Sequence, residues 1–338
     1  MPAGETTHRN TVTSPLEFNP DDVFVDLTPS FQRPFFLKCE GFNFAGSVKA
    51  RAALSMVDGA EEMGLLHPGS TLVESSSGSL GVALAALAAE RGYTFVCVTD
   101  SRCTDRHLRT MRSYGAEVVV VTEPDPVEGL LGARIRRVRE LCRSTPGALW
   151  LNQYANDDNW RAHYRSTGPA IVRAFPEVDF LFIGAGTTGT LTGCARFFKD
   201  IGHPVRIVAV DSVGSVTFGG PAGTRHIPGL GTGRRPEIVD ESVVDEVLMV
   251  PEREAVRMCR SLARRGYLLG GSTGTVLAGA RQRLAEENPG ALALGISPDL
   301  GERYLDSVYD DAWVHSRFGT ITDEDPLSPA GAAEFVHG

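Results

Sequence analysis

The sequence predicts an α/β protein with two lobes, each built on a mostly parallel sheet flanked by helices. Short runs of β-branched and apolar residues alternate with longer helical patterns along most of the 338 residues. Strands that are apolar on both faces and separated by helices are typical of parallel sheets covered on both sides. The alternation occurs in two series, one in each half of the chain, so we expect two lobes.

Each element of the two series is recognised by its period and composition. A strand ending at Glu40 and a helix over residues 48–62 come first. The first series then has strands at 70–74, 94–99 and 117–121 and helices at 81–90, 104–114 and 129–143. The second has strands at 180–183, 205–210 and 291–296 and helices at 190–199 and 274–287.

Composition argues against several classes of protein. The net charge is −9, whereas a nucleic-acid surface needs an excess of Lys and Arg. No apolar run is long enough to span a bilayer, and residues 1–10 lack the apolar region of a secretory signal. The six cysteines form no C-x-x-C or Cys/His pattern, so no zinc site or disulfide framework is indicated. We expect a cytoplasmic protein with no nucleic-acid, membrane or metal partner.

Three loops rich in glycine and hydroxyl side chains follow predicted strands. They cover residues 74–81 (ESSSGSLG), 186–190 (GTTGT) and 270–275 (GGSTGT). Each would present backbone N–H groups and hydroxyl donors at a helix N-terminus, an arrangement suited to anions. We interpret them as separate contacts for different groups of one buried ligand.

Two of these loops also match other motifs. Gly184, Gly186 and Gly189 form G-x-G-x-x-G, and Asp211 follows Gly189 by 22 residues, as in a dinucleotide-binding fold. Residues 270–274 match the G-x-S-x-G nucleophile elbow, with Asp299 and His315 downstream. The elbow should follow a strong central strand, which residues 264–269 do not provide. NAD and hydrolase chemistry therefore stay as alternatives at this point.

Lys49 favours a different cofactor. It stands at the start of the predicted helix 48–62. An ammonium at a helix N-terminus opposes the helix dipole, which lowers the pKa of the lysine and favours the neutral amine. A neutral amine is the group that an aldehyde cofactor requires.

The surrounding motifs resemble the cysteine synthase family of fold type II pyridoxal-phosphate enzymes. Residues 43–51 (NFAGSVKAR) are similar to the family's N-P-x-G-S-x-K-D-R, with Ala50 where Asp is usual. Residues 76–81 resemble T-S-G-N-T-G, with Ser79 at the usual Asn, and residues 152–154 resemble N-Q-F. The loops 186–190 and 271–274 resemble the phosphate loop and the serine loop. The similarity extends over about residues 15 to 305.

The resemblance implies a role for each matching residue. Lys49 would carry the cofactor and Ser272 would bond its ring nitrogen. The loop 186–190 would bind its phosphate, and Ser79 stands where the family's Asn contacts the ring hydroxyl. The implied cofactor contacts are Lys49, Ser79, Gly186, Thr187, Thr188, Gly189, Thr190 and Ser272, and the implied contacts for amino-acid substrates are Ser76, Ser77, Ser79, Gln153 and Tyr154.

The resemblance also implies an architecture like that of the tryptophan synthase β subunit. Residues 1–45 and 155–319 would form the larger, cofactor-binding lobe and residues 46–154 a smaller mobile lobe. A homodimer is expected. Residues 320–338, rich in Asp, Glu, Pro, Ser and Ala, are expected to be a flexible C-terminal tail.

The expected reaction is a β-replacement, because the neutral Ser272 hydroxyl favours loss of a β-substituent over full carbanion chemistry. Lys49 would anchor the cofactor and move the Cα proton, and the reaction would pass through an aminoacrylate. Arg234 and Arg235 follow a glycine loop in a region that is mostly uncharged in cysteine synthases. Arginine forks recognise phosphate or carboxylate, so we expect both to bind substrate.

These arginines, Tyr154 and residues 301–313 resemble one branch of the family. Its enzymes join O-phospho-L-serine to L-glutamate, giving N-(2-amino-2-carboxyethyl)-L-glutamate and phosphate. A partner dehydrogenase then frees 2,3-diaminopropionate for siderophores or peptide antibiotics. The alternatives are a cysteine synthase that uses O-acetyl- or O-phosphoserine with sulfide, and a non-catalytic relative that keeps the fold as a binding module.

Overall fold

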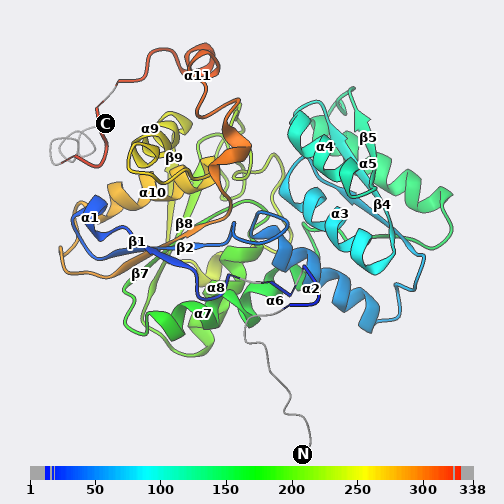
Figure 1. Ribbon diagram of the computed structural model, residues 1–338, viewed down its shortest axis with the longest axis horizontal. Helices are drawn as coiled ribbons and strands as arrows, with labels where there is room; N and C mark the ends of the chain where they lie inside the picture. The colour runs from blue at the N-terminus through cyan, green and yellow to red at the C-terminus, as the bar shows by residue number, and fades with distance from the viewer. Residues whose placement is uncertain (1–11, 16, 19, 323, 329–338) are drawn as a thin grey trace, which may run out of the picture.

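The computed structural model describes residues 12–15, 17–18, 20–322 and 324–328, and its larger lobe is built on a six-stranded sheet (Figure 1). β1 runs antiparallel to β2, and the other neighbouring strands pair in parallel. The strands across the sheet are β1 (Phe24–Asp26), β2 (Phe35–Cys39), β10 (Ala293–Ser297), β7 (Phe180–Gly184), β8 (Arg206–Ser212) and β9 (Glu246–Val250). The helical elements are α1 (Thr28–Phe31), α6 (Asp157–Arg165), α7 (Thr167–Ala174), α8 (Gly189–Asp200), η1 (Glu241–Val243), α9 (Glu252–Ala263), α10 (Gly271–Leu284), η2 (Gly301–Tyr304) and α11 (Asp311–Phe318).

The smaller lobe has a four-stranded parallel sheet built only from residues between 71 and 150. Its strands lie in the order β5 (Glu117–Val121), β4 (Thr94–Asp100), β3 (Thr71–Ser75) and β6 (Ala148–Trp150). Its helices are α2 (Lys49–Glu62), α3 (Ser79–Arg91), α4 (Asp105–Ser113) and α5 (Gly129–Ser144). The predicted α/β fold with parallel sheets flanked by helices is therefore confirmed.

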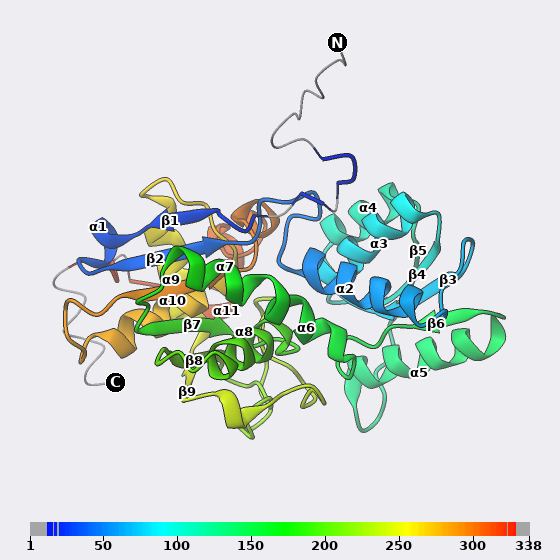
Figure 2. The same ribbon diagram turned by 90° about the horizontal axis from the view of Figure 1, so that it is seen from below.

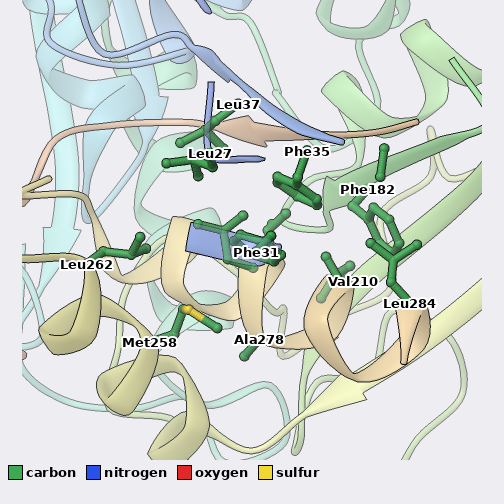
Figure 3. Close-up of a cluster of buried hydrophobic side chains, with 14 of the residues drawn as sticks. Leu27, Phe31, Phe35, Leu37, Phe182, Val210, Met258, Leu262, Ala278 and Leu284 are labelled. Atoms are coloured by element: carbon green, nitrogen blue, oxygen red, sulfur yellow. The ribbon is translucent and has the colours of Figure 1, made fainter. Parts of the chain in front are cut away.

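The central strand β7 of the larger sheet is apolar along its length and is packed on both faces. On β7, Phe180 and Phe182 face α9 and α10, whereas Leu181 and Ile183 face α7 and α8. Figure 3 shows the first of these layers, in which the side chain of Phe182 lies near those of α10. A strand packed on two faces reads as a continuous apolar run, which is the pattern found at residues 180–183.

The smaller lobe is organised around α3, a helix that is apolar all round. Every residue from Leu80 to Ala88 is buried. A helix with no polar face must be covered on all sides, and α3 packs against α2, α4 and the strands β3 and β4. Helix α6 contacts both α2 and α8 and so joins the two lobes (Figure 2).

Within the described residues, part of the predicted tail at 320–338 contacts the larger lobe. Leu327 is 2% exposed and belongs to the core of the larger lobe. The carboxylate of Asp325 pairs with Arg265 at 2.5 Å and accepts a hydrogen bond from Ser261 at 2.5 Å. One buried leucine and one ion pair anchor this segment, and its polar composition conceals both. Residues 329–338 lie outside the described residues.

Two of the glycine- and hydroxyl-rich loops leave the carboxyl ends of strands: 74–81 follows β3 in the smaller lobe and 186–190 follows β7 in the larger one. The third, 270–275, follows α9 and begins α10, so the expectation that it follows a strand is wrong. In parallel sheets such ends share one edge, where ligands bind. Within the described ranges, no helix is both long and apolar enough to cross a membrane.

Candidate active site

Lys49 is the first residue of α2, and the chain before it is held by the larger lobe. The amide of Val48 donates to the carbonyl of Pro298 at 2.7 Å. Nζ of Lys49 lies 3.2 Å from Oγ1 of Thr187. Burial lowers the pKa of Lys49 to about 8, from an ordinary value of 10.5. The amine is therefore much easier to deprotonate than that of a surface lysine.

The loop from Gly186 to Thr190 links β7 to α8 and forms a cradle at the helix N-terminus. Thr188 adopts a left-handed φ of 68°, and its Oγ1 is buried with no hydrogen-bond partner in the described part of the chain. A Cβ on Gly189 would stand 2.0 Å from Oδ1 of Asn159, so Asn159 can lie against the start of α8 only because residue 189 is glycine. Free N–H groups at a helix N-terminus and a spare hydroxyl suit a phosphate.

The serine loop between β3 and α3 is held partly by its own side chains. Oγ of Ser76 accepts hydrogen bonds from the amides of Gly78 at 3.3 Å and Gly81 at 3.0 Å. Ser77 lines the cavity beside Lys49. Oγ of Ser79 accepts a hydrogen bond from Nη1 of Arg303 at 3.2 Å. Ser79, at the position where the family usually has Asn, is therefore tied to the larger lobe.

Gln153 and Tyr154 follow β6 and close one side of the cavity. Nε2 of Gln153 donates to the carbonyl of Ser75 at 3.1 Å, which fixes the amide beside the serine loop. Tyr154 lines the cavity, and burial raises the pKa of its phenol. The tyrosine is therefore a neutral hydroxyl that can donate a hydrogen bond.

Ser272 is the second residue of α10 and is 2% exposed. A Cβ on Gly229, whose φ is 109°, would stand 2.2 Å from its Oγ, so this glycine lets the loop at 228–231 approach the serine. Next to it, the hydroxyl of Tyr304 donates to Oδ2 of Asp299 at 2.9 Å. Burial raises the pKa of Asp299 to about 6. Ser272 presents a neutral hydroxyl.

The structure thus brings most of the sequence-predicted site together. Two adjoining cavities share Lys49, Gly186 and Thr187. Together they are lined by Lys49, Ser76, Ser77, Ser79, Gln153, Tyr154, Gly186, Thr187, Thr188, Gly189, Thr190 and Ser272.

A comparison with known protein families decides what this arrangement belongs to. Residues 25–297 match the family described as pyridoxal-phosphate dependent enzyme. The chain belongs to this family. The predicted cofactor is confirmed, and pyridoxal phosphate is the group whose phosphate the 186–190 cradle fits.

The enzyme is similar to several characterised relatives. It is 41% identical over 281 residues to the N-(2-amino-2-carboxyethyl)-L-glutamate synthase of Ralstonia nicotianae. The alignment covers 82% of this chain and 83% of the relative. The crystal structure of O-ureido-L-serine synthase is 31% identical, with a TM-score of 0.81 over 90% of this chain and 99% of that one. A hydrogen sulfide-producing enzyme from Fusobacterium nucleatum is 28% identical, with a TM-score of 0.82 over 87% and 100%.

The structure does not form the dinucleotide site or the hydrolase triad that the other motifs suggested. Asp211 is fully buried, its Oδ1 accepts the amide of Ser212 at 2.7 Å, and it does not line the cavity. It cannot act as a ribose ligand from that position. His315 is exposed on α11 and is not among the residues lining the cavity around Ser272, so the hydrolase triad is not formed.

Arg234 and Arg235 are not brought to the cavity, contrary to the expectation from sequence. Arg234 is 41% exposed and lies 3.6 Å from Glu128 and 3.7 Å from Glu237. Arg235 is 50% exposed and pairs with Glu241 at 2.5 Å. Acidic neighbours on the surface attract both guanidinium groups, and neither side chain lines the cavity.

The cavity contains an arginine that sequence reasoning missed. Arg134, on α5, is 7% exposed and lines the cavity together with Tyr154. Its Nε lies 3.0 Å from Oδ2 of Asp100, at the end of β4. Helix α5 contains several arginines in close succession, including Arg136 and Arg137. No local signal distinguishes the one that is buried.

Proposed function

We propose that the enzyme joins O-phospho-L-serine to L-glutamate, giving N-(2-amino-2-carboxyethyl)-L-glutamate and phosphate. The observation that carries this proposal is Arg134, a buried guanidinium that faces the cavity of Lys49 next to Tyr154. A dianionic leaving group needs such a cation, whereas a neutral acetyl ester does not. The name and the 41% identity of the Ralstonia relative support the same assignment.

The two ends of phosphoserine have different partners in this cavity. Arg134 and the Tyr154 hydroxyl bind the phosphate. Ser77 and Gln153 bind the α-carboxylate beside the start of α3, where helix N–H groups favour an anion. These contacts place the amino acid with its Cα next to Lys49.

Lys49 and Ser272 direct the chemistry at Cα and Cβ. When bound, pyridoxal phosphate supplies the electron sink for the carbanion at Cα. The Lys49 amine accepts the Cα proton, which its lowered pKa permits near neutral pH. Ser272 is neutral and would not stabilise a protonated ring nitrogen. The negative charge that develops at Cα is therefore relieved by loss of the β-substituent. The Cβ–O bond breaks and phosphate leaves with the electron pair.

The second substrate, glutamate, then adds to Cβ. The glutamate ammonium releases one proton, and the departing phosphate takes up one proton to leave as hydrogen phosphate. The resulting amine forms the new C–N bond to Cβ, and Lys49 returns its proton to Cα. Water must be excluded meanwhile. Contacts between the lobes serve this purpose, because Arg303 donates to Ser79 and Arg106 donates to the carbonyl of Glu302. We propose that residues 46–154 move as one lobe that these contacts close.

The biological setting is part of the proposal. Six free cysteines, five of them buried, suit a reducing cytoplasm. Exposed aromatic side chains at Phe18, Phe42 and Phe44 suit a homodimer contact. The product contains a secondary amine between two amino-acid backbones, so a dehydrogenase acting on it would release 2,3-diaminopropionate for a siderophore or a peptide antibiotic.

One experiment separates this function from cysteine synthesis. The holoenzyme is incubated with phosphoserine or O-acetylserine as donor and with glutamate or sulfide as acceptor, and products are identified by mass spectrometry. We expect the glutamate adduct and stoichiometric phosphate from phosphoserine. Cysteine as the main product, with no adduct, would replace the proposal by a cysteine synthase.

A further inference from the structure

His107 is a cavity residue that the mechanism above leaves unused. It lies in the first turn of α4, is 7% exposed, and lines the cavity that contains Lys49. Its Nδ1 lies 2.9 Å from Oγ1 of Thr104. Its Nε2 is buried and has no hydrogen-bond partner in the described part of the chain. A buried polar atom without a partner is costly, and a bound substrate would supply the missing one.

Thr104 determines which proton the imidazole presents. Its Oγ1 is the N-cap of α4 and accepts the backbone amide of His107 at 3.3 Å. The hydroxyl proton of Thr104 is then available for Nδ1, which leaves the ring proton on Nε2. Burial, together with the charges of Arg303 and Arg106, lowers the pKa of His107 to about 4. The side chain is therefore a neutral N–H donor at physiological pH.

Two arginines outside the cavity lining, Arg303 and Arg106, act on His107 through their charges and make its surroundings positive. Arg303 donates to Oγ of Ser79 and to the carbonyl of Ala45 at 2.5 Å, and Arg106 donates to a carbonyl. Neither forms an ion pair within the described ranges, in contrast to Arg134, which has Asp100. The charge of Arg303 acts on the carboxyl group of Asp299, whose pKa is raised by burial. An anion is the ligand that these surroundings favour.

We propose that His107, in the positive field of Arg303 and Arg106, forms a second anion subsite, which binds a carboxylate of the amino acid that supplies the amine. This inference rests on the proposed function. His107 on α4 and Arg134 on α5 line the same cavity from different helices, and we assign the phosphate to Arg134 and the second carboxylate to His107. Glutamate offers a carboxylate that accepts a hydrogen bond from Nε2, whereas sulfide has no such group.

Two substitutions isolate the Nε2 contact. In His107→Gln the side-chain amide nitrogen can reach the place of Nε2, whereas in His107→Asn the shorter amide reaches only the place of Nδ1. We expect His107→Asn to raise the apparent KM for glutamate about tenfold, the usual cost of one hydrogen bond to a charged group. His107→Gln should restore most of that loss. The KM for phosphoserine, and the visible absorbance change on adding phosphoserine alone, should stay within about twofold.

The controls distinguish a binding role from a structural one. His67→Gln, at an exposed position after α2, should match the wild type. Thermal unfolding reports on folding, and if His107→Asn does not fold, His107→Phe replaces it because a phenyl ring fills the same space. An unchanged KM for glutamate, or an equal rise in both KM values, would overturn the subsite. Wild-type enzyme that releases phosphate but forms no glutamate adduct would instead overturn the proposed function.

Discussion

Nζ of Lys49 lies 3.2 Å from Oγ1 of Thr187, although 138 positions separate the two residues. The contact joins the start of α2 to the loop before α8, and thus the reactive amine to the phosphate cradle. Thr187 also accepts a hydrogen bond from Nδ2 of Asn159 at 3.2 Å. Its hydroxyl is therefore fixed in place, and the amine is held beside the cradle that we propose for the cofactor phosphate.

The pH dependence of cofactor capture follows from the amine. Because the pKa of Lys49 is lowered to about 8, the rate at which apoenzyme covalently captures pyridoxal phosphate should rise with pH and level off above about 8. With an ordinary lysine, the rate would continue to rise up to about pH 10.5, the usual pKa of the amine. Stopped-flow absorbance between pH 6 and 10 measures this rate.

Borohydride reduction and peptide mapping identify the lysine responsible. The chain contains three lysines, Lys38, Lys49 and Lys199. Lys38 is buried against Glu40 at 3.3 Å, and Lys199 is 56% exposed. We expect the reduced cofactor on Lys49 alone, and Lys49→Arg should abolish trapping. A label on Lys199 would contradict the assignment.

Arg134 should control recognition of phosphoserine. In Arg134→Lys the charge remains but the planar fork is lost, so we expect kcat/KM for phosphoserine to fall roughly 10- to 100-fold. Arg136→Lys, on the same helix but 54% exposed, is the matched control. Arg234→Ala and Arg235→Ala should change this ratio by less than about twofold, since surface ion pairs contribute little. If Arg235→Ala had the larger effect, the phosphate contact would have to be reassigned.

Gly189 should be required for cofactor binding. A methyl group at this position would meet Oδ1 of Asn159 at 2.0 Å, so Gly189→Ala must displace Asn159 or the start of α8. We expect a loss of about 1–3 kcal/mol of stability and weaker cofactor retention, measured by thermal unfolding and by absorbance after dialysis. Gly233→Ala, with nothing within 4 Å, should behave as wild type.

Tyr304→Phe should destabilise the protein in a pH-dependent way. The Tyr304 hydroxyl donates to Asp299, whose pKa burial raises from 3.8 to about 6. An acid with a raised folded pKa stabilises the fold below its unfolded pKa and loses that contribution as pH rises through the folded value. Without the hydroxyl the ionised carboxylate loses its donor, so the penalty should be about 1–3 kcal/mol above pH 6 and smaller near pH 4. Urea unfolding at pH 4.5 and 7.5 measures both. An equal loss at the two values would exclude Asp299 as the cause.

Much of the site could be predicted because it consists of contiguous loops. The glycines and hydroxyls of residues 76–79 and 186–190 stand side by side in the chain, and their chemistry depends on local backbone geometry that the residue types specify. Lys49 could be predicted for the same reason, since its place at a helix start follows from the sequence pattern around it. Period and composition likewise predicted the strands β3, β4, β5, β7 and β8.

Arg134 and His107 could not be found in the same way. Arg134 is one of several arginines on α5, and both become cavity residues only through the packing of distant segments, such as the pairing of Arg134 with Asp100. Arg234 and Arg235 show the converse. They form a conspicuous pair in the sequence, yet Glu237 and Glu241 satisfy them at the surface.

The sequence by itself determined the two-lobed α/β fold, the family and the cofactor cradle, because these depend on periodicity and on short motifs whose backbone geometry is local. Only the tertiary structure decided which charged side chains enter the cavity and that residues 324–328 are anchored. The physical reason is that the free energy of a charge depends on its burial and its partners, and both are fixed only when distant segments pack together.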